Sequence, residues 1–173
     1  MKKKLSLILM LAMAFTLALS ACSSNSDKSE PVENSDTAKP IESKVPVKEM
    51  VDKMLTDIEQ PNLMELDEEM VKQQYHLDLG LLEEYSVRIP MMNVKSNELS
   101  ILKVKDEKDI PAVEEAVKQR AADVQKSFEQ YLPDQYENAK NYKLVTKGNY
   151  ILFVISEEAD ALVNSFESFF TQQ

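Results

Sequence analysis

The sequence predicts an α+β domain: an antiparallel sheet of about four strands packed by helices, in the order α-α-ββ-α-ββ-α. Three observations lead to this fold class. Apolar residues recur every three or four positions over 47–58, 109–131 and 159–170, which is the spacing of helical faces. They alternate with polar residues, or run almost unbroken, over 85–104 and 142–155. Each of these two stretches is divided by a turn, so we expect two hairpins.

The first helix is expected to begin at Pro46 and to stop before Pro61. One face of it is apolar and is formed by Val47, Met50, Val51, Met54, Leu55 and Ile58. A short second helix is expected over about 68–75, with Asp67 as its N-cap. The apolar residues around Gly80 are expected to form a packed turn.

The first hairpin is expected to pair residues 85–94 with residues 99–104, and Lys95-Ser96-Asn97 has the composition of its turn. Pro90 has no backbone N–H to donate to a neighbouring strand. The strand that contains it should therefore lie at an edge of the sheet or carry a bulge.

The second hairpin is expected to join residues 142–147 to residues 149–155 through Gly148-Asn149. The later of these two strands is almost entirely apolar, so we expect it in the centre of the sheet, covered at least partly on both faces. The longest helix is expected over about 109–131, between a cap at Asp109 and a stop at Pro133.

The last helix is expected to follow a cap at Ser156. Its apolar stripe ends in three phenylalanines, Phe166, Phe169 and Phe170, which are either core residues or partly a docking face.

The first 21 residues have the organisation of an export signal. Lys2, Lys3 and Lys4 are followed by an apolar run over 5–19, which is shorter than the roughly 20 residues that a bilayer span requires. The run ends in Leu19-Ser20-Ala21-Cys22, which resembles the lipobox of bacterial lipoproteins. A Cys thiolate can accept a diacylglyceryl group as a thioether, and the small residues before it give a peptidase access. We therefore expect Cys22 to be the lipidated first residue of the mature chain.

The domain organisation follows from this interpretation. Residues 1–21 are expected to be a lipoprotein signal peptide, and 22–45 a lipidated Cys with a polar, disordered tether. Residues 46–173 are expected to form a single extracytoplasmic domain. The expected location is the extracytoplasmic face of the plasma membrane, with the lipid as anchor.

Composition excludes several kinds of site. The formal net charge is -10, so a nucleic acid is not an expected partner. One Cys and one His cannot build a closed zinc site, and two glycines cannot build a glycine-rich phosphate loop. We expect no cofactor and no metal.

Candidate catalytic residues all have plainer explanations. His76 is the only histidine and is expected in a surface turn. Ser96 with Lys95 or Lys103 could form a Ser–Lys pair, but such neighbours arise by chance in a chain rich in both residues. Acidic doublets could hydrolyse glycosides, although most of them are expected in first turns of helices, where the helix dipole favours them. These doublets are Glu68-Glu69, Glu83-Glu84, Glu114-Glu115 and Glu157-Glu158.

Two further groups of side chains are candidate ligand sites. Met50 and Met54 could bind Cu(I) through their thioethers, but they coincide with an apolar helical face and are expected to fill the core. Arg120 lies between Val117 and Ala121, at the border of an apolar stripe. We expect its guanidinium to pair with a carboxylate, with the grip of an anionic ligand as the alternative.

Several stretches together resemble a family of Gram-positive bacterial lipoproteins, the domain-of-unknown-function family 4358. They are LLEEYSVRIPMMNVKSNELSILKVKD, the helix with Arg120, FEQYLPDQYENA and KGNYILFVISEEAD. The resemblance covers about 70–173 and the export signal. It implies a small extracytoplasmic α+β domain attached to the plasma membrane, and it implies no activity.

The sequence favours a non-enzymatic, lipid-anchored domain that binds an envelope protein or a small ligand. Two alternatives stay open. One is a cell-wall-acting enzyme that uses carboxylates, and the other is an accessory subunit of an envelope transport assembly.

Overall fold

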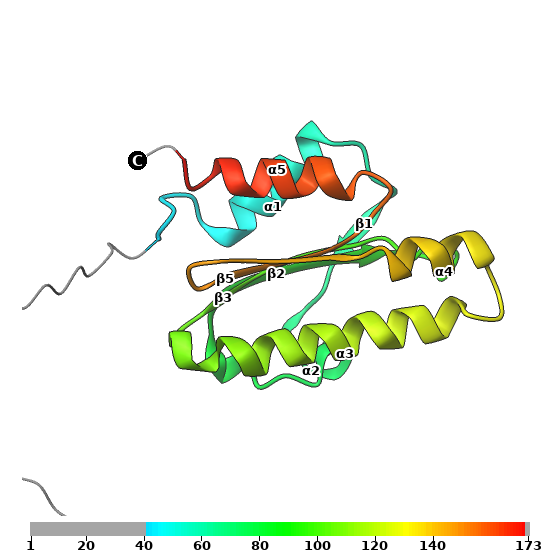
Figure 1. The fold of residues 1–173 in the computed structure, drawn as a ribbon, viewed down its shortest axis with the longest axis horizontal. Coiled ribbons are helices and arrows are strands. Elements are labelled where there is room, and N and C mark those ends of the chain that lie inside the picture. Colours follow the sequence, from blue (N-terminus) through cyan, green and yellow to red (C-terminus); the bar gives the residue numbers. More distant parts are fainter. Residues whose placement is uncertain (1–40, 172–173) are drawn as a thin grey trace, which may run out of the picture. The chain divides into compact units, whose positions relative to one another are not determined.

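A computed structural model describes residues 41–171 of the chain, which form one compact unit (Figure 1). Its α-helices are α1 (Val47–Asp57), α2 (Glu68–Tyr75), α3 (Ile110–Phe128), α4 (Pro133–Lys140) and α5 (Ala159–Ser168). Its strands are β1 (Leu63–Glu65), β2 (Leu82–Pro90), β3 (Glu98–Val104), β4 (Lys143–Lys147) and β5 (Tyr150–Ile155). Single 3-10 turns lie at Leu79–Leu81 and Glu107–Asp109.

The strands form one antiparallel sheet in the order β1-β2-β3-β5-β4. Helices α1 and α5 cover one face of this sheet, and α2 and α3 cover the other (Figure 1). The α+β fold class and the antiparallel sheet are therefore confirmed. The second strand of the second hairpin, β5, lies between β3 and β4, as its apolar composition predicted.

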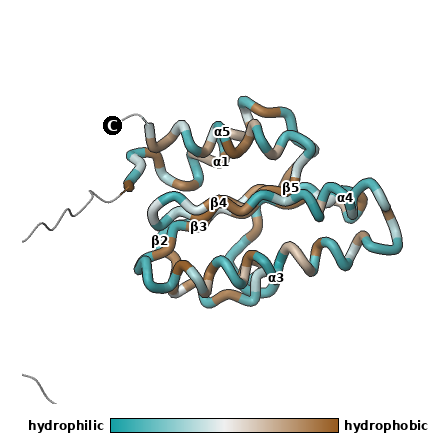
Figure 2. The backbone as a smooth tube through the Cα atoms, viewed as in Figure 1, coloured by the Kyte–Doolittle hydropathy of each residue, from teal (hydrophilic) through white to brown (hydrophobic). Residues whose placement is uncertain are grey.

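The two central strands send alternate side chains into two separate cores. In β3, Leu99 and Ile101 pack with α1 and α5, whereas Leu102 and Val104 pack with α2 and α3. This two-residue alternation is the geometry of a strand. Each face of the sheet therefore carries its own apolar cluster, and Figure 2 shows hydrophobic positions along both the strands and the helices.

The predicted strand number and element order were wrong in two places. The sheet has five strands because β1 pairs with the end of β2, with Leu63 opposite Pro90. Three residues are too few to show an alternation, so β1 gave no sequence pattern. β2 is not an edge strand, because it pairs with β1 on one side and with β3 on the other. Pro90 is its last residue, where a missing N–H disturbs the ladder least, and the register shift of β2, between Leu82 and Glu84, lies at its other end.

The second missed element is α4. Pro133 follows the end of the preceding helix, as the sequence predicts, but it is also the first residue of a new one. Proline suits this first position because its lost N–H would have had no partner inside the helix. The preceding helix α3 ends at Phe128, three residues earlier than predicted.

Some predicted caps are present and others are not. Asp67 accepts a hydrogen bond from the N–H of Met70 at 2.8 Å, and α2 has the predicted bounds. Asp109 precedes α3 but makes no side-chain cap hydrogen bond. Ser156 accepts from the N–H of Glu158 at 3.0 Å, so it caps the turn that leads into α5.

The lipobox and most of the expected tether lie outside the described residues. The last part of that tether, 41–45, lies against the domain. Glu42 accepts a hydrogen bond from the hydroxyl of Tyr150 at 2.9 Å, and Val45 packs on the α1–α5 side of the sheet. Gly148 has a φ of +57°, and a Cβ there would lie 2.8 Å from the carbonyl oxygen of Ile41. Within residues 41–171, no helix is both long and apolar enough to cross a membrane.

The phenylalanines of the last helix test the packing on the α1–α5 side. Phe166 is fully buried, with its ring 5.1 Å from that of Phe170, whereas Phe169 is only partly buried. We expect Phe166→Ala to lower the free energy of unfolding by about 3–5 kcal/mol because it leaves a cavity. Phe169→Ala is the matched control, with a loss of about half that or less. Urea titrations measure both, and equal midpoints for the two variants would contradict this packing.

Candidate binding site

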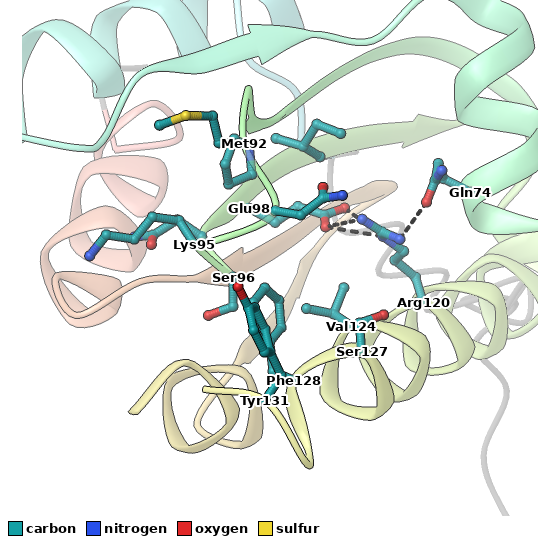
Figure 3. A pocket seen from close by; sticks show the side chains of 14 residues that line it. Gln74, Met92, Lys95, Ser96, Glu98, Arg120, Val124, Ser127, Phe128 and Tyr131 are labelled. Carbon is teal, nitrogen blue, oxygen red and sulfur yellow. Dashed lines mark hydrogen bonds and ion pairs between the residues drawn. The ribbon is translucent and has the colours of Figure 1, made fainter. Parts of the chain in front are cut away.

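A pocket of about 360 Å³ opens at one end of the sheet, on the side covered by α3 (Figure 3). It lies between the loop that joins β2 to β3, residues 91–97, and the C-terminal half of α3 with the turn that follows. Its walls are formed by Gln74, Ile89, Pro90, Met92, Asn93, Lys95, Ser96, Asn97, Glu98, Arg120, Val124, Ser127, Phe128 and Tyr131.

The floor of the pocket is an ion pair between Arg120 and Glu98. The Nε atom of Arg120 lies 3.1 and 3.0 Å from the two carboxylate oxygens of Glu98, and its Nη2 atom lies 2.8 Å from Oε2. Its Nη1 atom donates to Oε1 of Gln74 at 2.6 Å. The side chains of Arg120 and Glu98 are 12% and 1% exposed. The pair is therefore largely shielded from water while it still lines the pocket, as Figure 3 shows.

Tyr75 is fully buried beneath the ion pair and contacts Glu98. Its hydroxyl donates to Oε1 of Glu98 at 2.6 Å and lies 2.9 Å from Oγ of Ser100. Burial and the adjacent Glu98 carboxylate raise the pKa of Tyr75 well above its usual value, so the phenol keeps its proton. Burial lowers the pKa of Arg120, but the charge of Glu98 and its hydrogen bonds, with smaller contributions from neighbouring groups, together make the net change upward. The floor therefore pairs one guanidinium, that of Arg120, with one carboxylate, that of Glu98.

The positions of these groups follow from the elements that carry them. Glu98 is the first residue of β3 and shares its face with Ser100 and Leu102, which point toward α2 and α3. Arg120 lies on the inward side of α3, one turn before Val124. Each of these two groups is largely buried, and an unpaired buried charge would lower the stability of the fold. The ion pair removes most of this cost for both groups.

The rim of the pocket is exposed and carries two large apolar side chains beside the polar Asn93 and Lys95. Met92 and Tyr131 line the pocket and are 69% and 64% exposed. Met91 and Val94, in the same loop, are 68% and 45% exposed. These four residues make up most of the large hydrophobic side chains that are exposed within 41–171. Contiguous exposed apolar residues of this kind are typical of interaction sites.

Helix α4 holds the β2–β3 loop in place. Gln135 accepts a hydrogen bond from the N–H of Ser96 at 2.9 Å, and Asn138 donates to Oγ of Ser96 at 3.1 Å. Asn97 donates to a carboxylate oxygen of Glu157 at 3.0 Å, on the other side of the loop. Its own Oδ1 atom is buried and has no hydrogen-bond partner within residues 41–171. The loop is thus fixed by side chains from α4 and from the turn before α5.

Of the residues singled out from the sequence, Arg120 lies in the pocket and pairs with a carboxylate. Glu98 was missed because a single Glu at the start of an apolar strand resembles a solvent-exposed position. The signal that could have found it is the two-residue period, since Glu98 is in phase with the inward residues Leu102 and Val104. Cys22, Leu19, Ser20 and Ala21 lie outside the described residues.

The other candidate catalytic groups lie in different parts of the fold, except that Lys95 and Ser96 are neighbours in the pocket lining. His76 is exposed at the end of α2 and lies 3.5 Å from Asp123. Lys103 lies at the far end of β3 from Ser96, between Glu42 at 3.3 Å and Glu83 at 3.2 Å. Lys95 and Ser96 do line the pocket, but the hydroxyl of Ser96 is held by α4.

Within residues 41–171, no three His, Cys, Asp or Glu side chains are grouped so that they could hold a metal ion. Met50 and Met54 are fully buried in the core beneath α1. Glu157 lies beside a second, open hollow. Burial raises its pKa, but the hydrogen bond from Asn97, a backbone hydrogen bond and the charge of Lys95 together hold the pKa below its usual value.

Comparison with known protein families assigns the chain to one of them. The family described as "Domain of unknown function (DUF4358)" matches residues 56–156, and the chain belongs to this family. The match begins in α1 and ends directly after β5, so it includes both Glu98 and Arg120. No curated protein and no solved structure matches the chain.

The ion pair gives a prediction for stability. We expect Glu98→Gln to lower the free energy of unfolding by about 3 kcal/mol, because it leaves the Arg120 charge buried without a counter-charge. The double variant Glu98→Gln with Arg120→Gln should lose less than the sum of the two single variants. Urea unfolding of the four proteins measures the coupling, and Glu115→Gln on the exposed side of α3 is the control. Additive losses would contradict the pairing.

Tyr75 gives a prediction for alkaline pH. A tyrosine in the unfolded chain ionises near about pH 10, whereas Tyr75 in the folded chain ionises at higher pH. Above about pH 10 the unfolded chain therefore binds fewer protons, so stability falls as pH rises, by up to about 1.4 kcal/mol per pH unit. Tyr75→Phe should be less stable at pH 8 but should lose stability less steeply above about pH 10. Equal slopes in urea unfolding between about pH 9 and 11 would contradict the raised pKa.

Proposed function

We propose that this protein is a bacterial lipoprotein of a Gram-positive envelope, anchored through Cys22 on the extracytoplasmic face of the plasma membrane. We further propose that its folded domain is a non-enzymatic binding domain whose ligand occupies the pocket above Arg120 and Glu98. The anchor is supported by the positive start of the chain, the apolar run over 5–19 and the Leu19-Ser20-Ala21-Cys22 sequence.

The observation that supports binding is the contrast between the floor and the rim of one pocket. The floor is polar, ordered and electrically balanced, whereas the rim exposes Met92 and Tyr131 to solvent. A few fixed polar groups inside apolar walls are the usual composition of a ligand site. An exposed rim of this composition loses unfavourable contact with water when a ligand covers it.

The same geometry gives catalysis less support. Hydrolysis of a glycoside requires two carboxyl groups across a cleft, one of them able to give up a proton. Glu98 is the single carboxylate among the residues that line the pocket, and it is engaged by Arg120 and Tyr75. A role as accessory subunit of an envelope transport assembly is one form that binding could take, with a protein as the ligand.

The anchor is tested by metabolic labelling. Cells that express the full chain are grown with labelled palmitate, and the protein is then isolated from membrane and soluble fractions. We expect label in the membrane-bound wild type and none in Cys22→Ser, which has no thiol for the thioether. A wild type that carries no label, or that is found in the cytosol, would refute the anchor.

Binding at the pocket is tested by crosslinking in living cells. A photoreactive benzoylphenylalanine replaces Met92 at the rim or, as the control, Lys108, which is exposed near the opposite end of α3. We expect a discrete adduct from position 92 that disappears when Ser127→Phe fills the pocket. No adduct from position 92, or the same adduct from both positions, would contradict a binding role for this pocket.

A further inference from the structure

We infer that the pocket accepts one large apolar side chain of a partner polypeptide together with an adjoining, uncharged peptide carbonyl. This inference rests on the proposed binding function and names the chemistry of its ligand. It follows from three properties of the pocket: its charge balance, its free hydrogen-bond donors and the extent of its apolar rim.

The charge balance disfavours an anionic ligand. The positive charge of Arg120 is already matched by Glu98 at 2.8 Å. A ligand carboxylate at the floor would approach Glu98 as well as Arg120, and it would have to lose its hydration without gaining a free counter-charge. Lys95 is the other cation in the lining, but it lies in the exposed loop beside Glu157, which it also influences. A neutral acceptor is therefore the better complement to the floor.

The donors left free at the floor call for an acceptor. A guanidinium has five N–H groups, and Arg120 uses three of them on Glu98 and Gln74. Gln74 accepts through Oε1. The two N–H groups of its amide donate to no other group within residues 41–171. Both side chains line the same pocket, as Figure 3 shows. A carbonyl oxygen is a neutral group that can accept from these donors.

The walls and rim call for an apolar group that belongs to a larger molecule. Ile89, Val124 and Phe128 form apolar walls below Met92 and Tyr131. A volume of about 360 Å³ is near the lower end of the range for small-molecule sites. Two further exposed apolar residues, Met91 and Val94, lie in the same loop but outside the lining of the pocket. A polypeptide meets both conditions, because one side chain fills the pocket while its neighbours cover the loop.

Methionine suits this kind of surface. Its side chain is flexible and polarisable, so Met91 and Met92 can adjust to the shape of an apolar partner. The peptide groups that flank the inserted side chain are uncharged and carry a carbonyl close to it. A single apolar residue within a chain thus offers both an apolar side chain for the walls of the pocket and a neutral carbonyl for its floor.

The inference is tested with three small probes and the full chain purified from cells. The chain contains no tryptophan, so indole fluorescence reports on the probe alone. N-acetyltryptophanamide carries the apolar ring and two neutral peptide groups. N-acetyltryptophan replaces one of these groups by a carboxylate, and 3-methylindole has the ring without any peptide group.

We expect N-acetyltryptophanamide to bind about fivefold more tightly than either of the other probes. It alone has a neutral carbonyl on both sides of the ring-bearing residue, whereas N-acetyltryptophan brings a carboxylate to the floor and 3-methylindole brings no carbonyl. Ser127→Phe, at an exposed position of α3 that lines the pocket, should weaken this binding at least about tenfold. Ala122→Phe, also exposed on α3 and outside the lining, is the matched control and should bind like the wild type.

Each other outcome overturns the inference in a different way. Tighter binding of N-acetyltryptophan would make the floor an anion site, and equal binding of 3-methylindole would make the pocket merely apolar. If N-acetyltryptophanamide does not bind, or binds to Ser127→Phe as tightly as to the wild type, the pocket is not the docking point. If the adduct from position 92 nevertheless forms in cells, the proposed function survives and only the chemistry of its ligand is wrong.

Discussion

The ion pair between Arg120 and Glu98 is the constraint on which the rest of the site depends. A carboxylate at the first position of a central strand is buried by the fold itself, because β3 is covered by helices on both faces. Burial of a charge is tolerated only when a counter-charge and further hydrogen bonds accompany it. Arg120 supplies the first, and Tyr75 and Gln74 extend the network. The network thereby fixes the positions of α2, α3 and β3 relative to one another at the floor of the pocket.

The same pair determines what the pocket can recognise. An arginine without Glu98 would be an anion site, and a glutamate without Arg120 would be a cation site or an acid. Together they leave directional N–H donors with little net charge. The apolar rim on the β2–β3 loop then supplies the hydrophobic contribution, and α4 fixes that loop through Ser96. The missed helix is thus part of the site, because it determines where the rim lies.

Sequence patterns predicted the parts of this structure that repeat over many residues. The apolar faces of α1 and α3 and the unbroken run of β5 were visible because each places several residues at a fixed spacing. β1 has three residues and α4 begins at a proline, so neither offered such a pattern. For the site, Arg120 was visible as a charge on an apolar stripe. Its partner Glu98 depends on which strand lies opposite α3, and that is a property of the sheet order.

The most direct measurement is the nuclear magnetic resonance signal of the Arg120 Nε–H group. The chain has two arginines, Arg88 and Arg120, so a ¹⁵N-labelled sample gives two such signals and Arg88→Lys assigns them. The account predicts that the Arg120 signal exchanges slowly with water and moves when N-acetyltryptophanamide is added. An Arg120 signal that exchanges as fast as that of free arginine, and that is unchanged by the probe, would contradict it.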